Sequence, residues 1–297
     1  MSGDIRSFLD EIEERDGVYV GAMRKPINSA IKIVGSIHDD NTASRLGLRG
    51  GTVAGSIHLE LFPPLLLKAF GQRWFERGNV SIYFLDPTTD REEVRAMLKV
   101  PTSSDAQVEA WAERPDGRRI GEGTAAAGDS EEPSALSARD LSRYPPGELR
   151  MLADCAVGDS FPEVEARVTL DMQKHRLELT TDPLPWYSGD SPWGGPIATP
   201  CHLIDMMRPA PERYLRERIR AEAVPLYGAI EVGHVNGPVF VDKPYVTGGR
   251  IMSLGQSPRT EYLWFDSYVI DAEGLPVAQM RMQYRFMKAS SSLYQGG

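Results

Sequence analysis

One ten-residue segment occurs twice in this chain, and the repetition limits the folds that the chain can adopt. The segment that begins at Gly50 reads GGTVAGSIHL, and the segment that begins at Gly194, 144 residues later, reads GGPIATPCHL. Five of the ten positions are identical, and each copy leads into an apolar run that predicts a buried helix, Ile57 to Phe70 and Cys201 to Met207. The repetition predicts two copies of one structural unit.

The segments that follow the two predicted helices also match each other. The segment from Asn79 to Phe84 aligns with the segment from Asn236 to Phe240 at an offset of 157, and the turn Asp116-Gly117 aligns with Glu273-Gly274 at the same offset. The offset therefore grows by 13 residues between the helices and the strands. We attribute this growth to an extra segment in the second copy, Arg208 to Tyr227, which is rich in charge and proline.

Length and composition agree with two soluble units. The 297 residues fit two units of about 150 residues each. A net charge of −9 with scattered basic residues lacks the basic stripe typical of nucleic-acid binding. The two cysteines, Cys155 and Cys201, form no metal-binding spacing, and no apolar run approaches the ~18 residues of a membrane span. We expect a cytoplasmic protein with no cofactor, no bound metal and no membrane partner.

We expect four parts along the chain. They are an N-terminal unit at residues 1–127, a linker at 128–149 rich in Ser, Glu, Pro and Gly, a C-terminal unit at 150–288, and a flexible tail at 289–297. In each unit the helix precedes alternating segments that predict antiparallel strands. In the second unit, the segment from His175 to Thr180 also reads as extended. One helix followed by antiparallel strands, twice over, predicts an α+β fold.

This order of elements resembles that of the MaoC-like dehydratase/hydratase family. A polar loop, Ile37-His38-Asp39-Asp40, precedes the glycine motif, the buried helix and three or four long strands. The resemblance covers roughly residues 17–127 and 150–288. It implies a double hotdog, in which two tandem units each wrap an antiparallel sheet around a long central helix. It also implies that two such chains pair as a homodimer.

The family's catalytic pattern is incomplete in both copies. The family has an Asp five residues before a loop His; here His38 matches the His, but Ile33 stands at the Asp position. In the second copy Asp182 and Pro185 match the pattern, and Tyr187 stands where the His would be. Either the two units share a site, or activity is lost.

A related hotdog branch, the β-hydroxyacyl-thioester dehydratases, suggests how a site could be shared. There the His comes from one unit and a carboxylate from the central helix of the other. The resemblance implies that His38 and Asp205 form one catalytic pair, and that Asp182 and Tyr187 form a second site with Glu60 or His58. The alternative for Asp205 is a salt bridge with an arginine such as Arg208.

The resemblance also implies binding roles. The backbone N–H groups at Val53, Ala54 and Gly55, where the helix begins, would polarise the substrate carbonyl as an oxyanion hole. Trp186, Tyr187 and Trp193 either line an acyl pocket or fill an unused second site.

The histidines outside the loop suggest structural roles. His58 and His202 occupy equivalent repeat positions, which favours packing over catalysis. His175 and His234 read as surface residues.

The implied activity is that of a lyase. A His with a pKa near neutrality suits proton removal from the carbon next to a thioester carbonyl, with loss of the β-hydroxyl, or the reverse hydration. The substrate would be an acyl-CoA or an acyl carrier protein. Two alternatives remain: a thioesterase in which Glu60 activates water, and a catalytically degenerate protein that binds an acyl ligand.

Overall fold

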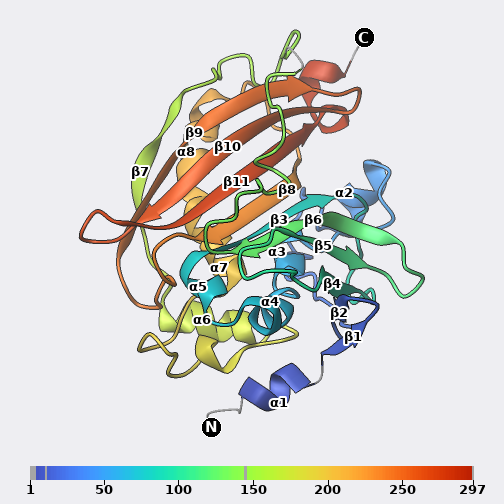
Figure 1. Ribbon diagram of the computed structural model, residues 1–297. Coiled ribbons are helices and arrows are strands. Elements are labelled where there is room, and N and C mark those ends of the chain that lie inside the picture. Colours follow the sequence, from blue (N-terminus) through green and yellow to red (C-terminus); the bar gives the residue numbers. More distant parts are fainter. Residues whose placement is uncertain (1–4, 11, 144–145, 296–297) are drawn as a thin grey trace.

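One antiparallel sheet of eleven strands dominates the structure, a computed structural model that describes residues 5–10, 12–143 and 146–295. The strands lie in the order β1-β2-β4-β5-β6-β3-β8-β11-β10-β9-β7 (Figure 1). The first six of these come from the N-terminal half of the chain and the last five from the C-terminal half. The strands are β1 (Glu13–Arg15), β2 (Val18–Val20), β3 (Gly78–Phe84), β4 (Arg95–Lys99), β5 (Val108–Glu113), β6 (Arg119–Ala127), β7 (Ser160–Ala166), β8 (Pro225–His234), β9 (Tyr245–Gln256), β10 (Thr260–Ile270) and β11 (Pro276–Met287).

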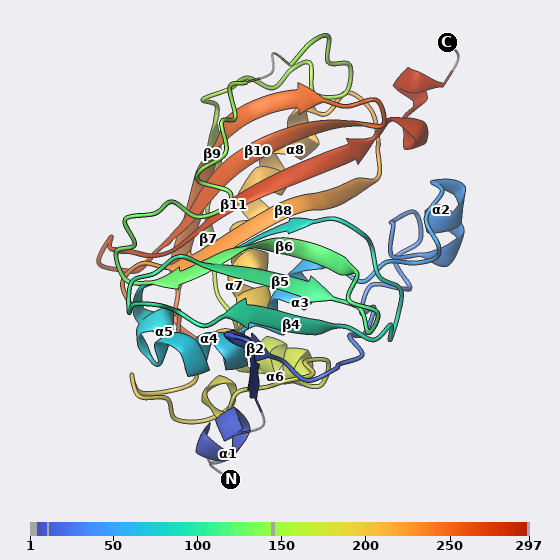
Figure 2. The ribbon, with the colours of Figure 1, turned by 45° about the vertical axis from the view of Figure 1, so that its right-hand side comes forward.

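The helices lie mainly behind the sheet in the view of Figure 2, which shows α3, α4, α7 and α8 beyond the strands. This arrangement confirms the predicted α+β architecture. The helices are α1 (Ile5–Asp10), α2 (Asp40–Arg45), α3 (Gly55–Leu59), α4 (Pro63–Phe70), α5 (Arg73–Arg77), α6 (Leu170–Leu177), α7 (Pro200–Met207) and α8 (Pro209–Arg218), with short 3-10 turns at Pro185–Tyr187, Lys288–Ser290 and Ser292–Tyr294.

The apolar pattern of the sequence explains which faces meet. The helices α4 and α7 consist largely of apolar residues that are buried, because the sheet wraps around them. Along β10, buried residues alternate for part of the strand with partly exposed ones, as expected for an antiparallel strand with one covered face. Leu66 and Ile204 from the helices and Phe265 from the sheet are fully buried members of one continuous core.

The two halves join through their first strands after the helices. β3 pairs antiparallel with β8 in a register that runs from Asn79 opposite Gly233 to Tyr83 opposite Ala229. On the inner side, α3 contacts α7. The seam between the units is therefore made of both sheet and helix, and loops of both units meet at its two ends.

The backbone contacts correct part of the predicted repeat. Two isolated β-bridges, Thr52 with Thr89 and Ile197 with Phe240, each join the segment before a central helix to a loop that follows a strand of the seam. By these bridges the loop after β3 matches the loop after β8 at an offset of 151. The predicted match of Asn79–Phe84 with residues 236–240 was wrong, because the true counterpart of β3 is β8. The predicted insertion at 208–227 is largely α8 and the start of β8, and α8 is the counterpart of α4.

Two local predictions also fail for identifiable reasons. The segment at 175–180 is not extended: residues to Leu177 belong to α6, which begins after Thr169, whose hydroxyl accepts a hydrogen bond from the Met172 N–H. The first central helix is not continuous from 57 to 70, since Pro63 and Pro64 begin a new helix, α4.

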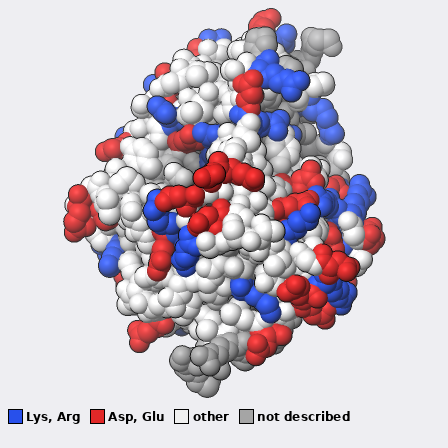
Figure 3. Space-filling model, viewed as in Figure 1, with Lys and Arg blue, Asp and Glu red and all other residues white. Residues whose placement is uncertain are grey.

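The outer side of the sheet carries the segment between the units. Ser134 and Ser137 donate hydrogen bonds to Glu231 of β8, and Leu136 is buried against the sheet near Trp264. On the face drawn in Figure 3, acidic and basic side chains are interspersed and no basic stripe runs across it. In the described ranges, no helix has the length and apolar character needed to cross a bilayer.

Candidate active site

A large cavity lies at one end of the seam between the two units. Its volume is about 1080 Å³. The first unit contributes the loop that carries His38, the start of α3 and the loop after β3, and the second unit contributes α8 and the ends of β8 and β11. Apolar side chains form much of its wall, including Leu48, Phe84, Ile120, Leu215, Ile219 and Phe286. The site is therefore shared between the units.

His38 lines this cavity with a defined tautomer. Its Nδ1 lies 2.6 Å from the backbone oxygen of Thr52. Because a carbonyl oxygen only accepts, Nδ1 must carry the proton and donate it. Nε2 is then the basic nitrogen, and it has no hydrogen-bond partner among the described residues. Burial lowers the pKa of His38. The hydrogen bond to Thr52 opposes this shift, and the nearby Arg208 guanidinium adds to it. The ring is therefore neutral at pH 7.

The glycine pair of the repeated motif holds the His38 loop in place. A Cβ atom at Gly51 would lie 2.2 Å from the His38 carbonyl oxygen, so only glycine allows this approach. The Gly51 N–H donates to Asp40 Oδ1 at 2.7 Å, and Asn28 Nδ2 donates to the His38 carbonyl at 2.8 Å. Asp39 caps α2 through the N–H groups of Asn41 and Thr42, as its position in the sequence predicts. Asp39 and Asp40 thus have structural roles.

The start of α3 presents free backbone donors to the cavity. Val53, Ala54 and Gly55 line it, and the capping residue Ala54 has no side-chain oxygen to satisfy the first N–H groups. Across the described chain, neither the Ala54 N–H nor the Gly55 N–H finds an acceptor. The predicted role of the Val53 N–H was wrong, because that N–H donates to the Thr88 carbonyl at 2.9 Å. A Cβ at Gly55 would lie 2.5 Å from the Phe84 ring, which explains the glycine.

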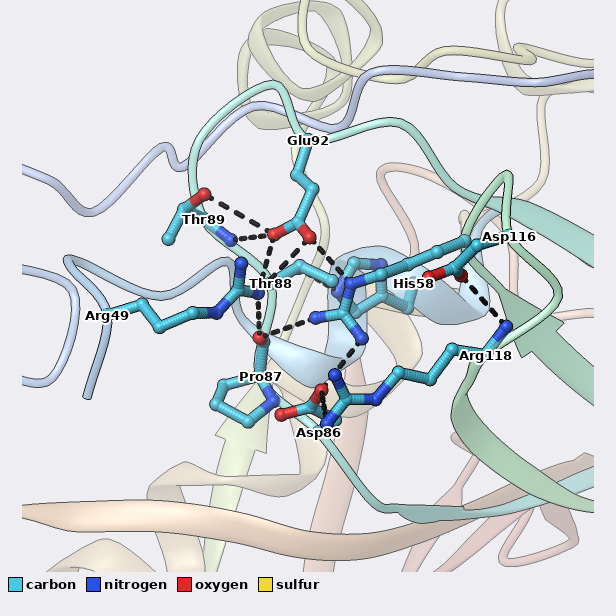
Figure 4. Close-up of polar contacts among 10 residues, drawn as sticks. Arg49, His58, Asp86, Pro87, Thr88, Thr89, Glu92, Asp116 and Arg118 are labelled. Carbon is cyan, nitrogen blue, oxygen red and sulfur yellow. Dashed lines mark hydrogen bonds and ion pairs between the residues drawn. The ribbon is translucent and has the colours of Figure 1, made fainter. Parts of the chain in front are cut away.

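A charged network fixes the loop after β3, which forms another side of the cavity. Glu92 accepts hydrogen bonds from Arg49 and from the Thr89 N–H, and Asp86 pairs with Arg118 (Figure 4). Arg114 joins these carboxylates, donating to Glu92 at 2.6 Å and to Asp86 at 2.8 Å.

His58 bonds to the same loop and is buried. Its Nε2 lies 2.8 Å from Thr88 Oγ1, and burial lowers its pKa to about 4. The predicted packing role of His58 therefore agrees with its contacts.

The structure does not place Asp205 directly against His38. Asp205 accepts a hydrogen bond from Arg208 Nη1 at 2.9 Å, which is the salt bridge that the sequence left as an alternative. Asp205 is not among the residues that line the cavity, whereas Arg208 is. Arg208 also donates to Glu212 Oε1 through Nε and Nη2, at 2.9 and 2.7 Å. The second unit thus presents an arginine and Glu212 to the cavity.

At the other end of the seam, aromatic side chains fill the equivalent space. Trp186 contacts Trp193 and Phe75 with ring centroids 5.4 and 5.3 Å apart, and Trp193 Nε1 donates to Glu76 at 2.9 Å. His234 packs against Trp74 here and is buried, so its predicted surface position was wrong. The helix start at this end is capped by Thr199, whose hydroxyl accepts from the His202 N–H. Of the two roles considered for the tryptophans, that of filling an unused site stays a prediction with which these contacts are compatible.

The residues predicted for a second site have other partners. Glu60 is buried and accepts three hydrogen bonds from the Arg176 guanidinium, the shortest 2.7 Å. Asp182 accepts from Arg24 Nε at 2.7 Å. Tyr187 is buried with a hydroxyl that lacks a hydrogen-bond partner among the described residues. Burial raises the pKa of Tyr187, and the nearby Glu60 raises it further. Glu60, Asp182 and Tyr187 do not line the cavity.

The sequence analysis missed most polar residues of the cavity. Among them are Arg208, Glu212, Tyr227 and Tyr284. Tyr227 and Tyr284 stack with ring centroids 5.5 Å apart. The signal that could have found Arg208 and Glu212 is their i, i+4 spacing directly after the apolar central helix. Over the residues that can be described, no cluster of three or more His, Cys, Asp or Glu is placed to hold a metal ion.

Comparison with known proteins gives the fold but no sequence relative. No protein-family model and no curated protein matches the chain. A Chloroflexus aurantiacus J-10-fl protein described as a MaoC domain protein dehydratase superposes with a TM-score of 0.63 at 13% identity, covering 92% of this chain and 96% of that one.

Two further solved structures are similar over most of their length. The protein Rv0216 of Mycobacterium tuberculosis, described as a double hotdog fold, has a TM-score of 0.58 at 14% identity, with 94% and 98% of the two chains covered. A MaoC-like dehydratase has a TM-score of 0.55 at 14% identity, with 94% and 99% covered. The chain is therefore a double-hotdog protein that shares its fold with MaoC-like dehydratases.

Proposed function

We propose that the protein adds water to an enoyl thioester, or removes it from a β-hydroxyacyl thioester, with His38 as the base. The observation that carries this proposal is the tautomer of His38, whose basic Nε2 lines a cavity shared by both units. The uncapped start of α3 lies on the same cavity, and Ala54 and Gly55 there have N–H groups available to a carbonyl oxygen.

In the hydration direction, the thioester oxygen would accept hydrogen bonds from the Ala54 and Gly55 N–H groups. These donors stabilise the negative charge that develops on that oxygen when water attacks the β-carbon. His38 Nε2 takes a proton from the water and passes it to the α-carbon. The bond to Thr52 holds the ring and stabilises the imidazolium that forms in between. Asp205 supports the site through its bond to Arg208.

The contacts of Glu60 do not favour the thioesterase alternative. A water-activating carboxylate needs an oxygen that reaches the substrate, and both Glu60 oxygens are held by Arg176 in a buried position. Acyl-ligand binding without catalysis is the alternative that Ile33 suggests, because it replaces the Asp of the family pattern.

The test is a hydration assay with His38→Ala and a matched histidine control. Wild type is incubated with short, medium and aromatic enoyl-CoA substrates, and loss of the conjugated thioester absorbance is followed. His175→Ala is the control, because His175 is exposed on α6 and does not line the cavity. We expect turnover that His38→Ala lowers by roughly 100-fold or more and that the control retains. Equal turnover in wild type and His38→Ala would refute the assignment.

The proposal extends to the carrier and the assembly. The substrate is an acyl-CoA or an acyl carrier protein, and two double hotdogs associate as a homodimer. Light scattering of the purified chain tests the dimer, and a monomeric mass would contradict it.

A further inference from the structure

The two units differ at the boundary between their paired inner helices. In the second unit Arg208 precedes Pro209 at the start of α8, and Glu212 follows four residues later. In the first unit Phe62 precedes Pro63 at the start of α4, so Phe62 and Leu66 occupy the equivalent positions. Phe62 and Leu66 are fully buried, whereas Arg208 and Glu212 line the open cavity. The charged pair thus occurs only beside the open site.

The hydrogen bonds leave one oxygen of Glu212 available. Both donors of Arg208 that reach Glu212 bind Oε1, and Nη1 of Arg208 binds Asp205. Oε2 of Glu212 has no partner within the ranges that the structure describes. A carboxylate held at one oxygen by a guanidinium is fixed in orientation, and its second oxygen can accept a strong hydrogen bond.

The residues around Glu212 belong to the proposed catalytic cavity. Arg208 is close enough to His38 to act on its charge. Glu212 and His38 both line the same cavity but come from different units. Tyr227 and Tyr284, which stack on each other, form the neighbouring wall of the second unit.

We propose that Glu212 is a second catalytic residue, whose Oε2 accepts a hydrogen bond from the attacking water or the β-hydroxyl, and that Arg208 positions it. This inference rests on the proposed hydration of a thioester. Glu212 would provide a carboxylate from the second unit. The first unit lacks one, because Ile33 stands at the Asp position of the family pattern.

The step balances without a change in Glu212. One hydrogen of the water is bonded to Glu212 Oε2, and the other is taken by His38 Nε2. The water oxygen forms a bond to the β-carbon, and the π electrons of the carbon–carbon double bond move toward the thioester carbonyl. The enolate collapses as His38 delivers its proton to the α-carbon. The product carries the β-hydroxyl, and both side chains return to their starting states.

The test is a binding measurement that needs no turnover. In a His38→Ala background, calorimetry compares 3-hydroxybutyryl-CoA with butyryl-CoA, which lacks only the hydroxyl. We expect the hydroxylated ligand to bind roughly 10- to 100-fold more tightly, since a hydrogen bond to a charged group is broken when the hydroxyl is absent. Glu212→Leu, which introduces the residue found at the first unit's equivalent position, should abolish that preference.

A carboxylate on the same helix provides the control. Glu217→Leu removes an exposed carboxylate of α8 that does not line the cavity, and it should leave the preference unchanged. Arg208→Met should abolish the preference, and Arg208→Lys should restore part of it. This pattern separates positioning from a general structural role.

Each other outcome overturns a stated claim. A preference that survives in Glu212→Leu refutes the role of Glu212 and leaves the thioester proposal intact. Equal binding of the two ligands before Glu212 is changed also refutes that role. If neither ligand binds in any background, the thioester proposal fails and the role of Glu212 fails with it. Urea unfolding of each variant shows whether it folds. If Glu212→Leu does not fold, Glu212→Gln replaces it in the comparison.

Discussion

The buried ion pair between Glu60 and Arg176 leads to a quantitative prediction for stability. Their side chains are 4% and 9% exposed. Arg176 Nε donates to both oxygens of Glu60 at 3.0 and 3.2 Å, Nη2 donates at 2.7 Å, and Thr180 Oγ1 donates at 3.1 Å. The pair joins the end of α3 in the first unit to α6 in the second. Removing one partner leaves a charge buried without a counter-ion.

We therefore expect Glu60→Met or Arg176→Met to lower the free energy of unfolding by about 3–5 kcal/mol each. The double variant should recover most of that loss, because two apolar side chains leave no buried charge to solvate. The expected result is thus strong non-additivity, with a coupling that a double-mutant cycle measures directly.

Urea unfolding monitored by tryptophan fluorescence measures all four free energies, and urea does not screen the ion pair. The control is Asp154→Asn, which breaks an exposed surface pair with Arg220 and should cause no measurable change. If the double variant lost as much stability as the two single variants added together, the argument from buried charge would be wrong.

Three further predictions concern the loop, the aromatic cluster and acid pH. Gly51→Ala places a methyl group 2.2 Å from the His38 carbonyl oxygen. It should displace His38 by about 1 Å, a shift that typically lowers kcat roughly 100-fold. Unchanged hydration kinetics would contradict this. Trp186→Ala should cost about 3–5 kcal/mol in urea unfolding because it empties part of the aromatic cluster, and hydration activity should persist in the folded variant. Burial lowers the pKa of His58, His202 and His234 to about 4 from 6.5, so the unfolded state takes up protons first and stability falls as the pH drops from 6.5 toward 4. His234→Phe should remove up to about 3 kcal/mol of that fall; an unchanged pH profile of the unfolding free energy would reject the assignment.

The sequence predicts the architecture because its periodic patterns and turns are local. The turn at Asp116-Gly117 and the strands on either side of it are found where the alternation places them, and so is the hairpin around Glu273-Gly274. The central helices were located by their apolar runs. β8 was not recognised as the counterpart of β3, because the two strands lie about 150 residues apart and no local pattern links them.

The site was predictable only in its first-unit part. His38 and the glycine motif lie close together in the sequence and share a local pattern. Arg208 and Glu212 belong to the segment 208–227, which the sequence analysis interprets as an extra segment of the second copy, rich in charge and proline. Their position in the cavity depends on how α8 packs on the sheet of the second unit, which no local pattern specifies.

The filled end of the seam has a consequence for binding stoichiometry. Two related units could in principle hold two ligands per chain, but the space opposite the cavity is occupied by Trp186, Trp193 and Phe75. A saturating titration should therefore give one bound thioester per chain. The two ends of the seam thus differ in what they contribute: one end keeps room for a ligand, and the other contributes dense aromatic packing that stabilises the chain around that space.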